Sequence, residues 1–133
     1  ESICKTYKPD IVLLDMGDKF AKGGYARQDE ALKANAVHAR QIAKEHECAI
    51  FYMSQLSAEA EGKVLLNQSM MEGSRTGKAA EADLMILIAK NPVVDGQDEE
   101  DTQRHLNVVK NKLTGWHGVV HCELDYKTAR YEA

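Results

Sequence analysis

Two polar side chains follow short apolar runs and could handle a phosphate group and its metal ion. Asp15 comes directly after residues 11–14, and Gln55 follows residues 49–53 with one serine between. Short apolar runs are typical of strands buried on both faces of a parallel sheet, and ligands bind at the carboxyl edge of such sheets. There Asp15 could hold Mg²⁺ through water, and Gln55 could bond a phosphate or an attacking water. The plainer interpretations are a turn-capping Asp15 and a surface Gln55.

Two lysines are spaced to place their charges on one face of a strand. Lys110 and Lys112 are separated by one residue, and alternate residues of a strand point to the same side. Two cations near a strand end could contact the phosphates of a bound nucleotide. The competing interpretation is an edge strand whose lysines protect it against aggregation.

Two further patterns lack the spacing that their chemistry requires. Residues 73–79 read Gly-Ser-Arg-Thr-Gly-Lys-Ala, with three residues between the glycines and no hydroxyl after the lysine. A phosphate-binding P-loop needs four residues there and a Ser or Thr after the lysine. His117 and His121, if both lie on one strand, are roughly 13 Å apart. They cannot then both bind one zinc ion at about 2.1 Å.

The composition is that of a soluble globular domain. The 133 residues are 44% apolar and 29% charged, which excludes a disordered tail and allows one modest core. The net charge of −4 means that any nucleic-acid contact must come from a local patch. No apolar run approaches the roughly 18 residues of a membrane span. Three widely spaced cysteines, Cys4, Cys48 and Cys122, favour a reducing cytoplasm in which they fill the core.

The elements that must position these side chains alternate between strands and helices. Apolar and small residues recur at helical spacing over residues 27–46, with acids near the start and a lysine near the end. We expect this helix, a helical turn over 78–82, strands over 11–14, 49–53, 83–89, 106–110, 119–124 and 128–131, and loops over 17–25, 56–77 and 91–104. This order predicts an α/β fold with a parallel sheet and an antiparallel edge.

In this order, the motifs resemble those of one family over most of the chain. The chain resembles the C-terminal part of the RecA-fold ATPase domain of DnaB-like hexameric replicative helicases, of the kind also found in bacteriophage primase-helicases. Residues 8–15, Lys-Pro-Asp-Ile-Val-Leu-Leu-Asp, resemble the Walker B segment. Residues 41–56, which end in Met-Ser-Gln-Leu, resemble the helix, strand and Ser-Gln sensor. Residues 77–88 resemble the segment after the DNA-binding loop, and residues 110–115 resemble the family's Lys-x-Arg strand.

The resemblance implies a nucleotide site that uses ATP and Mg²⁺. Asp15 would be the metal ligand, and Gln55 would sense the γ-phosphate. Lys110 and Lys112 would reach the ATP of the neighbouring subunit. Lys112 stands where the family usually has an arginine finger, and it keeps the charge without the planar fork. Asp15, Gln55 and Lys112 are therefore the candidate catalytic residues.

The resemblance also implies contact with single-stranded DNA. Residues 56–77 would contain the loop that faces the central channel of the hexamer. Arg75 and Lys78 would lie near a DNA phosphate, and Gln55 would couple the nucleotide to this loop. Departures from the pattern are the displaced position of Arg75, by two residues, and the absence of a P-loop and an upstream catalytic Glu.

The implied fold is a RecA-like three-layer α/β fold with a mostly parallel sheet and an antiparallel C-terminal hairpin, incomplete at its N-terminus. Residues 1–133 would be a single partial core that starts at Walker B, with the P-loop part preceding Glu1. The implied function is that of an ATP-dependent replicative DNA helicase, hexameric when intact, with primase as a candidate partner. It would act in the cytoplasm of a bacterial or bacteriophage-infected cell. This chain alone is expected to be inactive.

Two other hypotheses stay open at this point. One is a recombinase-like or circadian-clock-like ATPase that has the same core but does not unwind DNA. The other is a non-catalytic α/β module for oligomer contact or DNA binding. Neither the Ser-Gln pair nor the two lysines separate these hypotheses from a helicase.

Overall fold

The computed structural model describes residues 1–20, 24–73, 77–92 and 101–133, which form two compact units. Unit 1 comprises Glu1–Leu56 and Met71–Ala82, and unit 2 comprises Ser57–Met70 and Asp83–Ala133. Unit 1 contains a parallel strand pair and unit 2 an antiparallel sheet, so the fold is mixed α/β, as the sequence predicts. Within the described ranges, no helix has both the length and the apolar character needed to cross a membrane.

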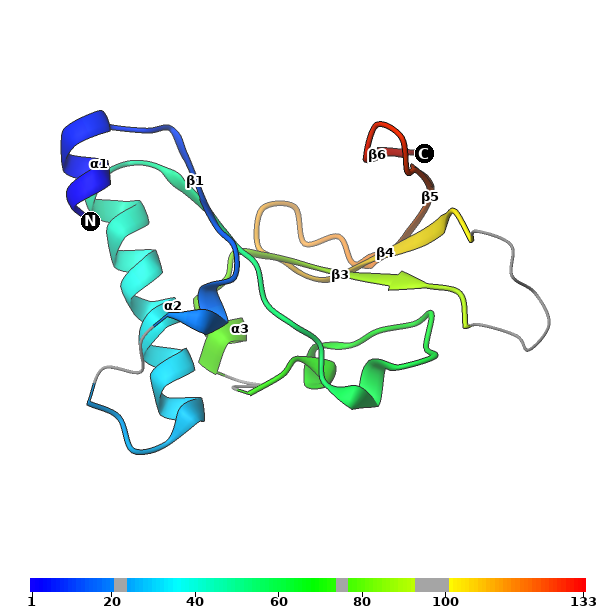
Figure 1. The fold of residues 1–133 in the computed structure, drawn as a ribbon, viewed down its shortest axis with the longest axis horizontal. Helices are drawn as coiled ribbons and strands as arrows, with labels where there is room; N and C mark the ends of the chain where they lie inside the picture. The colour runs from blue at the N-terminus through cyan, green and yellow to red at the C-terminus, as the bar shows by residue number, and fades with distance from the viewer. Residues whose placement is uncertain (21–23, 74–76, 93–100) are drawn as a thin grey trace. The chain divides into compact units, whose positions relative to one another are not determined.

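Unit 1 is built on two parallel strands joined by a long helix (Figure 1). Strand β1 (Ile11–Leu14) pairs with β2 (Ala49–Tyr52) in the register Ile11↔Ala49 to Leu14↔Tyr52. Helix α2 (Gln28–Glu45) connects them and packs against β2. These elements confirm the predicted strand–helix–strand order. Exposed and half-buried residues alternate along both strands, so the expectation of burial on both faces is wrong for this part of the chain.

Helix α2 presents a face of small residues to the rest of unit 1. Ala31, Leu32, Ala36 and Ala39 are buried, and the acids and lysine at its ends suit the helix dipole. Gly73 approaches this face closely. A Cβ on Gly73 would lie 2.2 Å from Leu32 Cδ1, and its φ of +79° is readily adopted by glycine alone. A side chain at residue 73 would therefore displace α2.

Three short helical segments complete unit 1. Helix α1 (Ser2–Tyr7) was not expected from the sequence, and it buries Cys4. The 3₁₀ turn η1 (Gly17–Lys19) follows β1, and α3 (Gly77–Glu81) falls at the predicted helical turn. Cys4 and Cys48 in this unit, and Cys122 in unit 2, are buried and free, which confirms their expected place in the core.

Unit 2 is a four-stranded antiparallel sheet with the strand order β3-β4-β5-β6. The strands are β3 (Leu84–Lys90), β4 (Gln103–Asn111), β5 (Gly118–Asp125) and β6 (Arg130–Glu132). The expectation of a mostly parallel sheet is thus wrong for the described strands, because only β1 and β2 are parallel. Strand β3 alternates between buried and exposed residues, although its sequence is a continuous apolar run.

Strand β4 differs from its predicted bounds at both ends. It begins at Gln103, so the expected loop over residues 91–104 is shorter, and residues 93–100 of that loop lie outside the described ranges. It ends at Asn111, so Lys112 lies beyond the strand. The expectation that Lys110 and Lys112 alternate on one strand is therefore wrong. The hairpin of β5 and β6 is confirmed.

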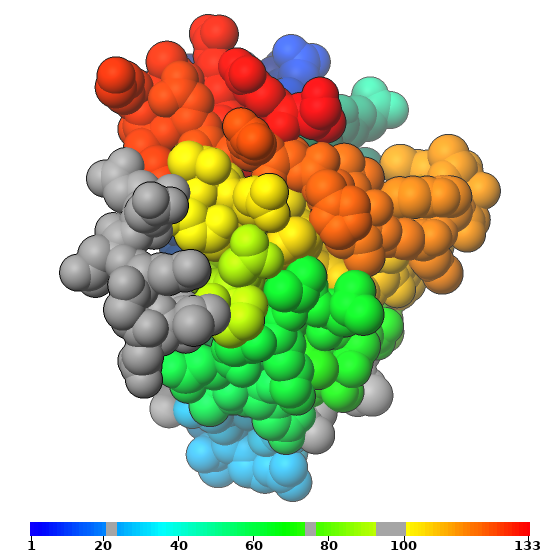
Figure 2. All heavy atoms as spheres, turned by 90° about the vertical axis from the view of Figure 1, so that its right-hand side faces the viewer, coloured from blue at the N-terminus to red at the C-terminus, as the bar shows by residue number. Residues whose placement is uncertain are grey.

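Residues 57–70 cover part of the unit 2 sheet. They contain the 3₁₀ turns η2 (Ala58–Ala60) and η3 (Gln68–Met70). The Asn107 side chain of β4 binds them, because its Oδ1 accepts from the Leu66 N–H at 3.0 Å and its Nδ2 donates to the Val64 carbonyl at 3.0 Å. Figure 2 shows this green segment next to the yellow surface of β4. One buried amide thus fixes a segment without regular pairing to the sheet.

Candidate functional site

The ends of β1 and β2 place two of the predicted residues at one sheet edge. The parallel pairing continues past the strands, because the Met53 N–H donates to the Leu14 carbonyl at 3.1 Å and the Gly17 N–H donates to the Met53 carbonyl at 3.0 Å. Asp15 follows β1, and Gln55 lies three residues beyond the end of β2. The prediction that both lie at the carboxyl edge of a parallel pair is confirmed.

Both predicted side chains at this edge are exposed. Within the described part of the chain, the Asp15 carboxylate makes no hydrogen bond or ion pair, so it is open to a cation. Two hollows, of about 370 Å³ in unit 1 and about 460 Å³ in unit 2, are not lined by Asp15 or Gln55. These two residues therefore form an open edge and do not enclose a ligand by themselves.

Beside this edge lies a buried ionic network that the sequence did not indicate. The Lys78 side chain is 4% exposed and that of Asp18 is 12% exposed. The Lys78 ammonium donates to both carboxylate oxygens of Asp18, at 3.2 and 3.0 Å, and to Ser54 Oγ at 2.6 Å. The Ser54 hydroxyl donates to Asp18 Oδ2 at 2.5 Å. Lys78, Asp18 and Ser54 thus satisfy one another, and we call them the lysine network.

Tyr52 extends the lysine network toward the sheet. Its hydroxyl donates to Asp18 Oδ1 at 3.3 Å. Burial, the negative charge of Asp18 and this hydrogen bond raise the pKa of Tyr52, so the phenol keeps its proton at any ordinary pH. Its ring occupies the space above Gly17, where a Cβ would lie 2.3 Å from Tyr52 Cζ. A residue larger than glycine at position 17 would therefore push the ring away from Asp18.

The structure separates the two predicted DNA contacts. Arg75 lies outside the described residues. Lys78 lies inside unit 1, and its three ammonium protons are directed at Asp18 and Ser54. The expectation of a solvent-facing Lys78 at a DNA phosphate does not fit this arrangement. No local pattern indicates this burial, because the partners of Lys78 are 60 and 24 residues away.

The two predicted nucleotide-binding lysines belong to unit 2. Lys110 lies on β4 opposite Met85 of β3. The backbone N–H of Lys112 donates to the Asp83 carbonyl at 2.8 Å, and its ammonium lies 3.2 Å from Asp83 Oδ1. Both side chains of that ion pair are about half exposed, so the pair contributes little and Lys112 can exchange its partner. Their expected grouping with Asp15 and Gln55 joins the two units and stays a prediction.

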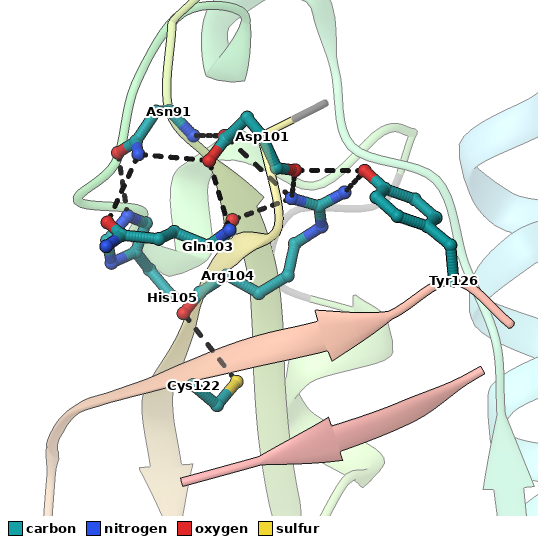
Figure 3. A network of polar contacts seen from close by, with 7 residues as sticks. All are labelled: Asn91, Asp101, Gln103, Arg104, His105, Cys122 and Tyr126. Carbon is teal, nitrogen blue, oxygen red and sulfur yellow. Dashed lines mark hydrogen bonds and ion pairs between the residues drawn. The ribbon is translucent and has the colours of Figure 1, made fainter. Parts of the chain in front are cut away.

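Unit 2 contains its own polar network, centred on the buried Arg104 (Figure 3). Arg104 Nη1 donates to the carbonyls of Asp101 and Gln103, both at 2.7 Å, and Nη2 donates to the Tyr126 hydroxyl at 2.6 Å. The Asp101 carboxylate accepts from the backbone N–H groups of Asn91 and Gln103, at 3.1 and 3.0 Å. This network joins the chain just after β3 to the start of β4.

A histidine pair adjoins the Arg104 network. His105 Nδ1 and His121 Nδ1 are 2.8 Å apart, and His105 Nε2 lies 2.9 Å from Asn91 Oδ1. With this amide orientation the Asn91 oxygen can only accept, so Nε2 of His105 carries the proton and His121 donates to His105 Nδ1. In the described ranges, no group of three or more His, Cys, Asp or Glu side chains is arranged to hold a metal ion. The rejection of a zinc site at His117 and His121 thus agrees with the structure.

Comparison with known proteins identifies the fold. No family model matches the sequence, and no curated protein matches it. The structure is similar to a solved ATPase domain of a DnaB-like helicase, with a TM-score of 0.76 and 17% identity, over 92% of this chain and 43% of that one. It is also similar to a DnaB-like replicative helicase solved in a study of its interactions with primase, with a TM-score of 0.72 and 18% identity, over 92% of this chain and 29% of that one.

The chain therefore has the fold of part of a DnaB-like helicase ATPase domain, as the sequence motifs predict. It spans less than half the length of either solved chain.

Proposed function

We propose that this chain is part of the ATPase core of a DnaB-like DNA helicase, in which ATP hydrolysis drives movement along single-stranded DNA. One observation carries the proposal. Asp15 and Gln55 are both exposed at the carboxyl edge of the parallel pair β1–β2, in a fold similar to helicase ATPase domains. Ligands of α/β proteins bind at this edge of a parallel sheet.

The chemistry of Asp15 suits Mg²⁺ bound with ATP. Magnesium commonly takes one or two carboxylates and completes its shell with water and phosphate oxygens. The open carboxylate of Asp15 matches that need, and a bound Mg²⁺ would neutralise charge on the phosphates. The Gln55 amide would hydrogen-bond the terminal phosphate or hold the attacking water. This division of roles needs further residues to enclose the nucleotide.

We further propose that the intact protein is a hexamer in which Lys110 and Lys112 reach the ATP of a neighbouring subunit. The exposed ion pair of Lys112 with Asp83 supports this, because the ammonium can leave Asp83 for a phosphate at little cost. Arg75 is the proposed DNA contact. Primase is a proposed partner, since one similar structure is of a helicase studied with primase.

The experiment compares two aspartates at opposite ends of β1 in the intact protein that contains this chain. Asp15→Asn should lower the turnover of ATP hydrolysis by about 100-fold, which corresponds to a few kcal/mol of lost metal-assisted stabilisation. Asp10→Asn is the matched control, because Asp10 is exposed just before β1 and away from the carboxyl edge. Equal activity of the two variants would contradict the proposed metal role of Asp15.

Strand displacement on a forked DNA duplex separates a helicase from an ATPase that does not unwind. The wild-type protein should unwind the duplex with ATP and Mg²⁺. Gln55→Ala should reduce the stimulation of ATP hydrolysis by single-stranded DNA. ATP hydrolysis without unwinding would favour the recombinase-like or circadian-clock-like hypothesis, and no hydrolysis at all would favour the non-catalytic module.

A further inference from the structure

The lysine network connects three segments of unit 1 that are distant in sequence. Asp18 belongs to η1 directly after β1, Ser54 follows β2, and Lys78 lies in the first turn of α3. Ser54 is the residue before Gln55, the candidate sensor of the phosphate. The position of Gln55 in unit 1 is therefore tied to the position of α3 through one side-chain contact, from Lys78 Nζ to Ser54 Oγ at 2.6 Å.

Backbone pairing adds a second tie at the same place. The Glu72 N–H donates to the Gln55 carbonyl at 3.1 Å, and Leu56 forms an antiparallel bridge with Met71. The chain leaves unit 1 after Leu56 and returns to it at Met71. Gln55 thus stands at the stem of the excursion 57–70, and Lys78 holds the residue next to it.

The geometry of Lys78 excludes a free cation at this point. Its side chain is 4% exposed, and an ammonium has three protons, for which Asp18 and Ser54 supply three acceptor oxygens. A buried ion pair is hard to open, because either charge left alone would remain buried without a partner. Ser54 and α3 are therefore expected to move together.

We propose that Lys78 is a positioning residue that, through Asp18 and Ser54, sets the place of Gln55 relative to α3 and so couples ATP turnover to DNA occupancy. This inference rests on the proposed helicase function. It assigns Lys78 to the coupling of the two sites and gives it no contact with DNA phosphate. Asp18 and Ser54 become members of the same device, although neither touches the nucleotide or the DNA in this role.

The test uses the intact protein and the variants Lys78→Met and Ser54→Ala. Two quantities are measured: the kcat and KM of ATP hydrolysis at saturating single-stranded DNA, and the affinity for single-stranded DNA as a function of salt. Lys33→Met is the matched control, since Lys33 is an exposed lysine of α2 in the same unit. Thermal melting of each variant checks that it is folded.

The expected result separates turnover from DNA binding. Lys78→Met should lower the DNA-stimulated kcat at least tenfold, while the DNA affinity stays within twofold and its salt dependence is unchanged. Ser54→Ala keeps the Asp18–Lys78 ion pair, so it should fold even if Lys78→Met does not, and it should lower the same kcat about threefold or more. Lys33→Met should match the wild type.

Three results would overturn the proposal. A DNA phosphate ligand at Lys78 would weaken DNA binding and reduce the salt slope by about one in the Lys78→Met protein, with kcat unchanged at saturating DNA. Wild-type kcat in folded Ser54→Ala protein would show that the contact to Ser54 does not couple the sites. A wild-type protein without DNA-stimulated hydrolysis would overturn the proposed function itself, and the inference with it.

Discussion

The two units bury a cation in opposite ways. In unit 1, Lys78 pairs with the carboxylate of Asp18, which is 60 residues away in the chain. In unit 2, Arg104 donates to carbonyls one and three residues away and to the hydroxyl of Tyr126, and the nearest carboxylate oxygen, of Asp101, is 3.8 Å distant. Lysine concentrates its charge at one point, whereas the guanidinium spreads its donors over several neutral acceptors.

This difference indicates what each network does. The lysine network holds distant segments together through a charge pair, so it depends on both partners being present. The network of Arg104 fixes the local path between β3 and β4 with neutral acceptors, as does the amide of Asn107 for residues 57–70. A charge pair can act as an all-or-none tie, while neutral bonds are lost one at a time.

The largest expected effect on stability comes from breaking the charge pair. Lys78→Met leaves Asp18 buried without its cation, which should lower the free energy of opening of unit 1 by about 3 kcal/mol. Hydrogen exchange of peptides from each unit measures this, and peptides of unit 2 provide the internal reference. The double variant Asp18→Asn/Lys78→Met should recover much of the loss. Equal protection in wild type and Lys78→Met would show that the ion pair does not hold unit 1.

A smaller effect is expected from the neutral amide of unit 2. Asn107→Ala leaves the Leu66 N–H buried without an acceptor, so the free energy of opening of residues 57–70 should fall by about 2 kcal/mol. The same hydrogen-exchange measurement applies, now with unit 1 as the reference. Leu113→Ala, at a residue that is 75% exposed, is the control and should change little. A loss as large as that of Lys78→Met would remove the contrast between the two networks.

The smallest effect is expected from Tyr52 at alkaline pH. The folded state keeps the Tyr52 proton, because burial and Asp18 raise its pKa, while the unfolded tyrosine loses it near pH 10. Above that pH the unfolded state binds fewer protons, so stability falls as the pH rises. Tyr52→Phe should flatten the decline in the free energy of unfolding between about pH 9 and 11, measured by urea titration. Identical slopes would mean that Tyr52 does not contribute.

Local patterns were sufficient for the elements of the candidate edge. The apolar runs before Asp15 and Ser54, and the helical spacing of residues 27–46, depend on neighbours a few residues away, and β1, β2 and α2 were predicted from them. Strand pairing was harder to predict. The run 84–90 is apolar throughout apart from its final lysine, yet β3 has one exposed face with Leu84, Ile86 and Ile88, since its only partner in the described sheet is β4.

The order of residues alone was enough to specify the strand–helix–strand core of unit 1, the place of Asp15 and Gln55 after their strands, and a helical turn at Lys78. It was enough because hydrophobic periodicity is a local property of the chain. The burial of Lys78 against Asp18 and Ser54, and the networks of Arg104 and of the His105–His121 pair in unit 2, became visible only once the chain was folded. Those outcomes depend on contacts between residues many positions apart, and charged residues are buried only where such contacts supply their partners.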